Sequence, residues 1–218
     1  MEDIGLILFT AIAVPLVIML IIFKGKSRVL LLCLLTGMFM NLFAGEVNGL
    51  ILKYTELDYY FIAVNIVPII EEIFKMTLIV VLFYSFKVDK QLLIECALTI
   101  GAGFAILENV SLFVNSNDLV TFPFALIRGF GAGLMHVITC YIYAIGLNFI
   151  GKKNYIVFSG TIGILTLSIL YHSAYNIIVQ SKYSYFGFAL PLATLIFILI
   201  IQLFIHKKEK LNYENKVM

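Results

Sequence analysis

The stretch VPIIEEIFKMTLIVV, residues 67–81, places two adjacent glutamates and a lysine inside an otherwise apolar run. Apolar residues continue on both sides, over about 59–86, which is long enough for a helix to cross the ~30 Å hydrocarbon core of a bilayer. Ionisable side chains at the centre of such a helix cost about 2.5–3.5 kcal/mol each on insertion scales. Glu71, Glu72 and Lys75 therefore indicate either a structural ion pair or a functional site inside a membrane protein.

The composition supports a membrane protein. Of the 218 residues, 62% are hydrophobic and 13% are charged, and the mean hydropathy is +1.05. A soluble domain of this size cannot bury that much apolar surface. The net charge of +2 gives no electrostatic basis for binding nucleic acid, so the lipid bilayer is the expected surrounding. Cys33, Cys96 and Cys140 each lie in an apolar run and are expected to be packing residues.

Seven apolar runs are long enough to be membrane spans. We predict an all-α, polytopic transmembrane bundle that forms a single domain over residues 1–218, with the motif-bearing core at about 60–180. Its spans are expected at about 4–23, 29–52, 59–86, 91–114, 122–150, 155–179 and 184–205.

The basic residues of the connections indicate the orientation. Eleven of them fall on one side: Lys24, Lys26, Arg28, Lys87, Lys90, Lys152, Lys153, Lys207, Lys208, Lys210 and Lys216. The other side carries only Lys53 and Lys182. Because basic residues accumulate in cytoplasmic loops, the N-terminus is expected outside and the C-terminus in the cytoplasm.

Several polar side chains lie deep inside consecutive predicted spans, and could converge on one pocket. At ~1.5 Å of rise per residue, the glutamates and histidines fall between the midplane and the outer face, where a cavity open to the outside would hydrate them. The set comprises Glu71, Glu72, Lys75, Glu108, Asn109, Arg128, His136, His172 and Asn176.

Helical spacing groups some of these residues. Glu71 and Lys75 are four residues apart, so they share a face and can pair, and the same holds for His172 and Asn176. Pro68 frees a backbone carbonyl and can kink the helix one turn before the glutamates.

Small residues at four-residue intervals predict close helix contacts around the site. One such row is Gly129 and Gly133, between Arg128 and His136. Another is Ala97, Gly101 and Ala105.

The polar set fits the hydrolysis of a peptide bond. Two neighbouring carboxylates do not ionise together easily, which supplies both an acid and a base. A glutamate with histidines and an asparagine can activate water and stabilise an oxyanion. Metal-assisted hydrolysis, with Glu and His as ligands, is the alternative. The chain has no zincin motif and no Gly-x-Ser-x-Gly elbow, so a serine or cysteine nucleophile has no specific support.

Four motifs, in order and with matching spacing, resemble the PrsW family of bacterial membrane proteases over about residues 60–180. They are EEIFK, GFAILENV, RGFGAGLMH and YHSAYN. The paired glutamates and the His-x-x-x-Asn element also resemble the wider superfamily of CAAX prenyl endopeptidases and bacteriocin-immunity proteins. Lysine stands here where that superfamily often has arginine, and GFAILEN favours PrsW over the other branches.

The resemblance implies roles for individual residues. Glu71 and Glu72 would activate water, His136 and His172 would bind water or the oxyanion, and Asn176 would bind the oxyanion. Glu108 joins this catalytic set, whereas the supporting residues are Lys75, Arg128 and Asn109. Family members have been described both as metalloproteases and as metal-independent glutamate proteases. We favour the glutamate type without a cofactor; a metallo-type enzyme would hold zinc through Glu72, His136 and His172.

The resemblance further implies a substrate and a location. A single-pass membrane protein, an anti-sigma factor, would be cut on the extracytoplasmic side of the bacterial cell membrane. This site-1 cleavage would release a sigma factor for a stress response. The alternatives are a prenyl-protein endopeptidase, an immunity protein of the same superfamily, and a proton-coupled transporter, since intramembrane Glu, His and Arg also build ion relays.

Overall fold

The fold is known from a computed structural model, which describes residues 4–86, 88–116, 120–151 and 157–217. Within this part of the chain all regular structure is helical, as predicted. The elements are α1 (Ile4–Ile22), α2 (Gly25–Tyr54), α3 (Tyr59–Phe61), the π-helix η1 (Ile62–Ile66), α4 (Val67–Ser85), α5 (Lys90–Asn115), α6 (Phe122–Ile150), α7 (Val157–Val179), the 3-10 helix η3 (Ser184–Phe186) and α8 (Ala189–Val217).

Six of the seven predicted spans coincide with helical segments that are long and apolar enough to cross a membrane. The remaining predicted span, at 59–86, is the continuous segment formed by α3, η1 and α4. Its three charged residues, Glu71, Glu72 and Lys75, fall within five positions, and it is not among those six. It packs against α2, α5, α6 and α7, so it lies inside the bundle. The chain is therefore an all-α, multi-pass membrane protein.

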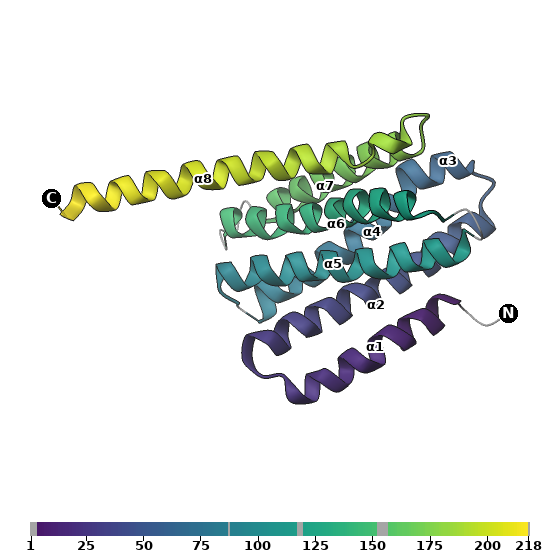
Figure 1. The fold of residues 1–218 in the computed structure, drawn as a ribbon, viewed down its shortest axis with the longest axis horizontal. Helices are drawn as coiled ribbons and strands as arrows, with labels where there is room; N and C mark the ends of the chain where they lie inside the picture. The colour runs from purple at the N-terminus through teal and green to yellow at the C-terminus, as the bar shows by residue number, and fades with distance from the viewer. Residues whose placement is uncertain (1–3, 87, 117–119, 152–156, 218) are drawn as a thin grey trace.

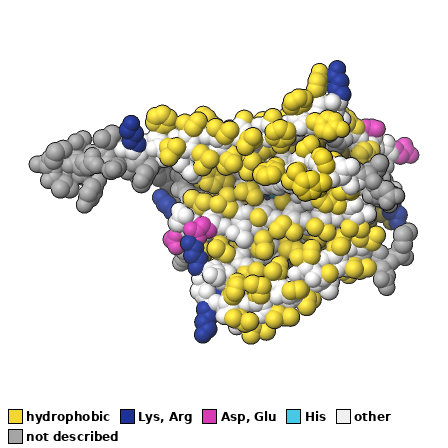
Figure 2. Space-filling model, viewed as in Figure 1, with side chains coloured by type: hydrophobic (Ala, Val, Ile, Leu, Met, Phe, Trp, Pro, Cys, Tyr) yellow, Lys and Arg dark blue, Asp and Glu magenta, His cyan; other side chains and the backbone are white. Residues whose placement is uncertain are grey.

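The long helices lie side by side, and α1 begins and α8 ends at opposite ends of the bundle (Figure 1). Hydrophobic side chains cover the middle of the face seen in Figure 2, and charged side chains gather toward its ends. Of the basic residues used for the orientation, Lys87, Lys152 and Lys153 and the side chains of Lys208, Lys210 and Lys216 lie outside the described part of the chain.

Polar residues start several helices. Asp58, Asp89 and Thr121 each accept a hydrogen bond from a backbone N–H three residues later, at 3.1, 2.9 and 3.4 Å. Such N-caps satisfy donors that the first helical turn leaves free. Gly25, the first residue of α2, has φ +57°, a conformation that side chains with a Cβ rarely adopt. These local signals set the boundaries of the spans.

Glycines bring the backbones of α2 and α5 into contact. A Cβ at Gly37 of α2 would overlap the carbonyl of Ile100, and a Cβ at Gly103 of α5 would overlap the carbonyl of Leu34. Small residues at membrane-helix interfaces allow this approach. The pair α2–α5 therefore forms a close-packed wall beside α4. The three cysteines are free and buried and belong to the apolar core of the bundle, as expected for packing residues.

The two predicted rows of small residues have different outcomes. A Cβ at Gly101 would lie 2.7 Å from the carbonyl oxygen of His136, so this residue does bring α5 against α6. Gly129 and Gly133 have open space around them, so their expected helix contact is wrong. The contact glycine of that segment is Gly131, where a Cβ would lie 2.9 Å from the hydroxyl oxygen of Tyr175.

The segment before α4 widens into a π-turn. The N–H of Val67 donates to the carbonyl of Ile62, five residues back, which is the π-helical pattern. Pro68 follows at the first turn of α4, where a missing N–H is tolerated best. The predicted disturbance one turn before the glutamates is therefore this π-turn.

Candidate functional site

α4 carries three charged residues of the site, and all three are buried. The exposed fraction is 6% for Glu71 and 0% for both Glu72 and Lys75. Successive residues of an α-helix point about 100° apart, so the two adjacent glutamates meet different neighbours. Glu71 faces a cavity, whereas Glu72 and Lys75 face the packed interior.

Glu72 is held by donors from three helices. Its Oε1 accepts from the Lys75 ammonium at 2.6 Å and from His172 Nδ1 at 2.7 Å, and its Oε2 accepts from the Tyr143 hydroxyl at 2.9 Å. The sequence prediction paired Lys75 with Glu71, four residues away, and this is wrong. Residues three apart are equally close on a helix, and Glu72 is the one that points toward the other partners of the ammonium.

Lys75 determines how His136 is protonated. Besides Glu72, its ammonium contacts His136 Nδ1 at 2.9 Å and Thr139 Oγ1 at 3.2 Å, so all three of its donors are used. Because an ammonium can only donate, Nδ1 of His136 must accept. The ring proton is therefore on Nε2, from which it is donated to Glu108.

Glu108 bridges His136 and Arg128. One carboxylate oxygen contacts His136 Nε2 and the other accepts from Arg128 Nη2. Both Glu108 and Arg128 line the cavity, and the buried Nε of Arg128 has no hydrogen-bond partner in the described residues. The pairing neutralises the carboxylate, while the Nε–H of the guanidinium has no acceptor among the described residues.

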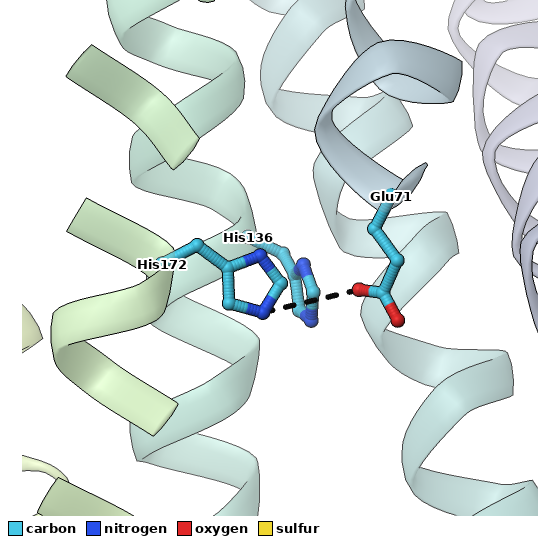
Figure 3. A group of neighbouring side chains, drawn as sticks. All are labelled: Glu71, His136 and His172. Carbon is cyan, nitrogen blue, oxygen red and sulfur yellow. Dashed lines mark ion pairs between the residues drawn. The ribbon is translucent and has the colours of Figure 1, made fainter. Parts of the chain in front are cut away.

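Glu71 and His172 face each other at the wall of the cavity. Oε2 of Glu71 lies 3.9 Å from Nε2 of His172, as Figure 3 shows. That oxygen is buried and has no hydrogen-bond partner within the described part of the chain. Since His172 donates through Nδ1 to Glu72, its Nε2 carries a lone pair in the neutral ring. Two acceptors therefore point at the same space.

The cavity has a volume of about 780 Å³. Of the predicted site residues, Glu71, Glu108, Arg128, His172 and Asn176 line it, and the rest lie outside its described lining. Its other walls include Tyr59 of α3, Leu112 of α5, Thr121 and Phe124 at the start of α6, Gln180 after α7, and Ser184 and Tyr185 of η3. These segments lie beside the loops predicted to be extracytoplasmic, which agrees with the expected outward opening.

The two asparagines differ in their surroundings. Asn176 lines the cavity, and its Nδ2 donates to the carbonyl of Ala63 at 2.9 Å. The amide oxygen of Asn109 is buried without a hydrogen-bond partner among the described residues. No hydrogen bond between Asn109 and the charged cluster is seen in the described part of the chain, so its supporting role stays a prediction.

Tyr143 and Thr139 are partners that the sequence analysis missed. They lie seven and three residues after His136, which places all three on one face of α6. In an aromatic-rich chain neither residue stands out by type. The spacing from His136 was the only signal that could have identified them.

The group Glu71, His136 and His172 has donor atoms that all lie within 4.8 Å of one another, as a metal site would require. His172 fits such a site, because a carboxylate behind its Nδ1 leaves Nε2 free, as in many metal centres. Glu71 fits as well. His136 does not, since its Nε2 carries a proton donated to Glu108 and a ligand nitrogen must be unprotonated. The predicted ligand Glu72 does not fit either, because its oxygens are occupied by Lys75, His172 and Tyr143.

Comparison with known families gives a match over most of the chain. A model described as "PrsW family intramembrane metalloprotease" matches residues 25–204. The match extends from α2 into α8 and includes every residue of the site. Neither the curated proteins nor the solved structures contain a match to the chain.

Proposed function

Because the chain belongs to the PrsW family of intramembrane proteases, we propose that it cleaves a single-pass membrane protein, such as an anti-sigma factor, in a bacterial cell membrane. The cut would fall on the extracytoplasmic side, as the first step of a proteolytic cascade that frees a sigma factor. That the chain is an intramembrane protease follows from the family. The substrate, the side and the catalytic type are our proposal.

The observation that carries the proposal is the pair of acceptors, Glu71 Oε2 and His172 Nε2, 3.9 Å apart at a cavity wall. A water molecule about 2.8 Å from each would donate one hydrogen to each acceptor. Both lone pairs of its oxygen would then point toward the cavity, where a peptide carbonyl can lie. This favours water activation by Glu71 as a general base.

Glu72 acts on the reaction indirectly, through His172. By accepting from Nδ1 of His172, its carboxylate fixes the tautomer that leaves Nε2 free to hold the water. Lys75 and Tyr143 keep Glu72 ionised and in place. The two neighbouring glutamates therefore divide the work: Glu71 takes the proton, and Glu72 orients the histidine.

The reaction then follows from the donors present. As the water oxygen attacks the carbonyl carbon, Glu71 takes one proton and the carbonyl oxygen becomes an oxyanion. The unpartnered Nε–H of Arg128, a residue of the same cavity wall, can stabilise this charge. When the C–N bond breaks, Glu71 returns the proton to the leaving nitrogen. The products are a carboxyl and an amino terminus, and each step uses only side chains of the protein.

The position of the cavity supports an extracytoplasmic substrate. Its outer wall is formed by Thr121, Gln180 and Tyr185, which border loops on the side with few basic residues. A volume of about 780 Å³ holds a short extended peptide. The segment just outside the membrane span of a single-pass protein fits this location.

The test uses the full-length protein in detergent with a panel of single-pass anti-sigma factors. Cleavage is compared for wild type, Glu71→Gln and Glu95→Gln, each with and without a strong chelator. Glu95 is the matched control, because it lies in α5 outside the cavity, paired with Lys26 at 2.5 Å. We expect wild type and Glu95→Gln to cleave equally, with or without chelator, and Glu71→Gln to be inactive.

Other results would change the assignment. Loss of cleavage on chelation that zinc restores would contradict the glutamate type and place a metal on these residues. Cleavage by folded Glu71→Gln at the wild-type rate would contradict the role of Glu71. Cleavage confined to the cytoplasmic segment of every substrate would reverse the proposed side.

A further inference from the structure

A hydrogen bond joins the side chain of Asn176 in α7 to the segment that precedes α4. The amide donates through Nδ2 to the backbone carbonyl of Ala63, at 2.9 Å. Ala63 lies in the π-turn η1, 113 residues before Asn176 in the chain. Asn176 therefore binds protein backbone from the wall of the cavity.

The carbonyl of Ala63 needs this partner because of Pro68. In the π-turn the N–H of Val67 donates to Ile62, five residues back. The next residue in the same register is Pro68, whose partner would be Ala63, but proline has no N–H. A carbonyl left without a donor in a membrane bundle is costly. The amide of Asn176 takes the place of the missing backbone donor.

The π-turn also determines which residues face the cavity. Tyr59, Ala63, Val67 and Glu71 follow one another at intervals of four residues, and all four line the cavity. In an α-helix of 3.6 residues per turn, each interval of four rotates the side chain by about 40°. A π-turn has more residues per turn than an α-helix, so the side chains rotate less over the interval that contains it. The row from Tyr59 to Glu71 therefore stays on one wall only while the π-turn persists.

We propose that Asn176 is a positioning residue, which keeps the π-turn closed by replacing the hydrogen bond that Pro68 cannot make. Through the π-turn it sets the direction of Glu71 relative to His172, one turn before Asn176 on α7. This differs from the oxyanion-binding role that the family resemblance implies for Asn176. The inference rests on the proposed function for its activity readout alone, because its effect on thermal stability does not depend on any substrate.

The test is a double-mutant cycle with Asn176→Ala and Pro68→Ala in the full-length protein in detergent. Asn176→Ala leaves the Ala63 carbonyl unpaired and should lower Tm by roughly 5 °C. Pro68→Ala supplies a backbone N–H to that carbonyl, so in its presence Asn176→Ala should lower Tm by less than half as much. Additive changes in Tm would overturn the proposal. If Asn176→Ala alone does not fold, recovery of folded protein by Pro68→Ala supports it, and lack of recovery overturns it.

Asn65→Ala is the matched control. Asn65 also donates from its amide to a backbone carbonyl near the π-turn, that of Phe61 at 3.1 Å, but this carbonyl is not the partner that Pro68 leaves free. Its effect on Tm should be the same with and without Pro68→Ala. On a cleavable substrate, Asn176→Ala should lower kcat roughly tenfold or more, and Pro68→Ala should restore most of it. An equal fall in both backgrounds would assign Asn176 to the oxyanion and overturn the positioning role.

Discussion

Helices α1 and α4 have the same length, 19 residues, and opposite relations to the rest of the molecule. α1 has no ionisable residue, and of its side chains only Ala13 is buried. α4 buries seven residues, including two glutamates and a lysine. By composition α1 is the better membrane helix, whereas α4 carries three charged residues and is not among the candidate spans. The site is thus carried by the helix whose charged side chains would be costly in lipid. The neighbouring helices offset this cost by supplying polar partners.

The largest difference in stability is expected between substitutions of the two glutamates of α4. Glu72→Gln leaves the buried Lys75 ammonium without its carboxylate, and breaking such a pair costs about 3–5 kcal/mol. Glu71→Gln should cost no more than about 1 kcal/mol, because the changed oxygen has no hydrogen-bond partner in the described structure. Unfolding of both variants in detergent measures the difference. Equal destabilisation would show that the adjacent carboxylates are not divided between interior and cavity.

The next test removes both charges of the pair. In Glu72→Gln/Lys75→Met no buried charge remains unpaired, so the double variant should be more stable than Glu72→Gln alone, by about 1–3 kcal/mol. The same unfolding measurement on the single and double variants gives the coupling. A double variant less stable than both singles would argue that α4 needs the ion pair itself.

Tyr143→Phe tests how much one neighbouring helix contributes to α4. The hydroxyl donates to Glu72 at 2.9 Å, and its removal should cost about 1–2 kcal/mol while leaving the packing of the ring intact. Tyr141→Phe, on the same helix with its hydroxyl bound to Gln202 at 2.8 Å in an exposed place, is the control and should cost less. The order of the two Tm values checks this expectation.

The smallest effect is expected on α1. Ile18 is 56% exposed, so Ile18→Ala should change the free energy of unfolding by no more than about 0.5 kcal/mol. The same substitution at Ile79 of α4, which is 0% exposed, should cost about 2–5 kcal/mol. If the two changes prove equal in detergent, α1 is packed in a way that its exposure does not reveal.

The large features of the fold and the main ionisable residues of the candidate site could be predicted from the sequence. Apolar runs located the spans, since membrane helices have one dominant constraint, their length across the hydrocarbon core. The cost of charge in lipid singled out Glu71, Glu72, Glu108 and Lys75. Counting residues from the span ends placed the glutamates and histidines between the midplane and the outer face, and the structure brings them together in one cluster.

The partners within the site were not predictable in the same way. Three-residue and four-residue spacings both place helix side chains side by side, so α4 alone could not decide which glutamate Lys75 would bind. The choice depends on His136 and Thr139, which come from α6. The same limit applies to Glu72 as a predicted metal ligand, because the neighbours that occupy its oxygens include residues of other helices.

Backbone irregularity was the other limit. Pro68 indicated a disturbed helix, but a proline is compatible with a kink, a break or a π-turn. Which of these forms depends on whether a donor elsewhere can satisfy the freed carbonyl. In this chain that donor is Asn176, which belongs to a helix far along the sequence.

The bond between Lys75 and Glu72, three residues apart in one helix, matters for biosynthesis. α4 leaves the ribosome before α6 and α7, so Tyr143, His136 and His172 do not yet exist when α4 reaches the translocon. During that interval the nascent helix must carry its own counter-ion. A lysine one turn after the glutamates provides it, so that the segment can enter the membrane before the remainder of its polar partners has been synthesised.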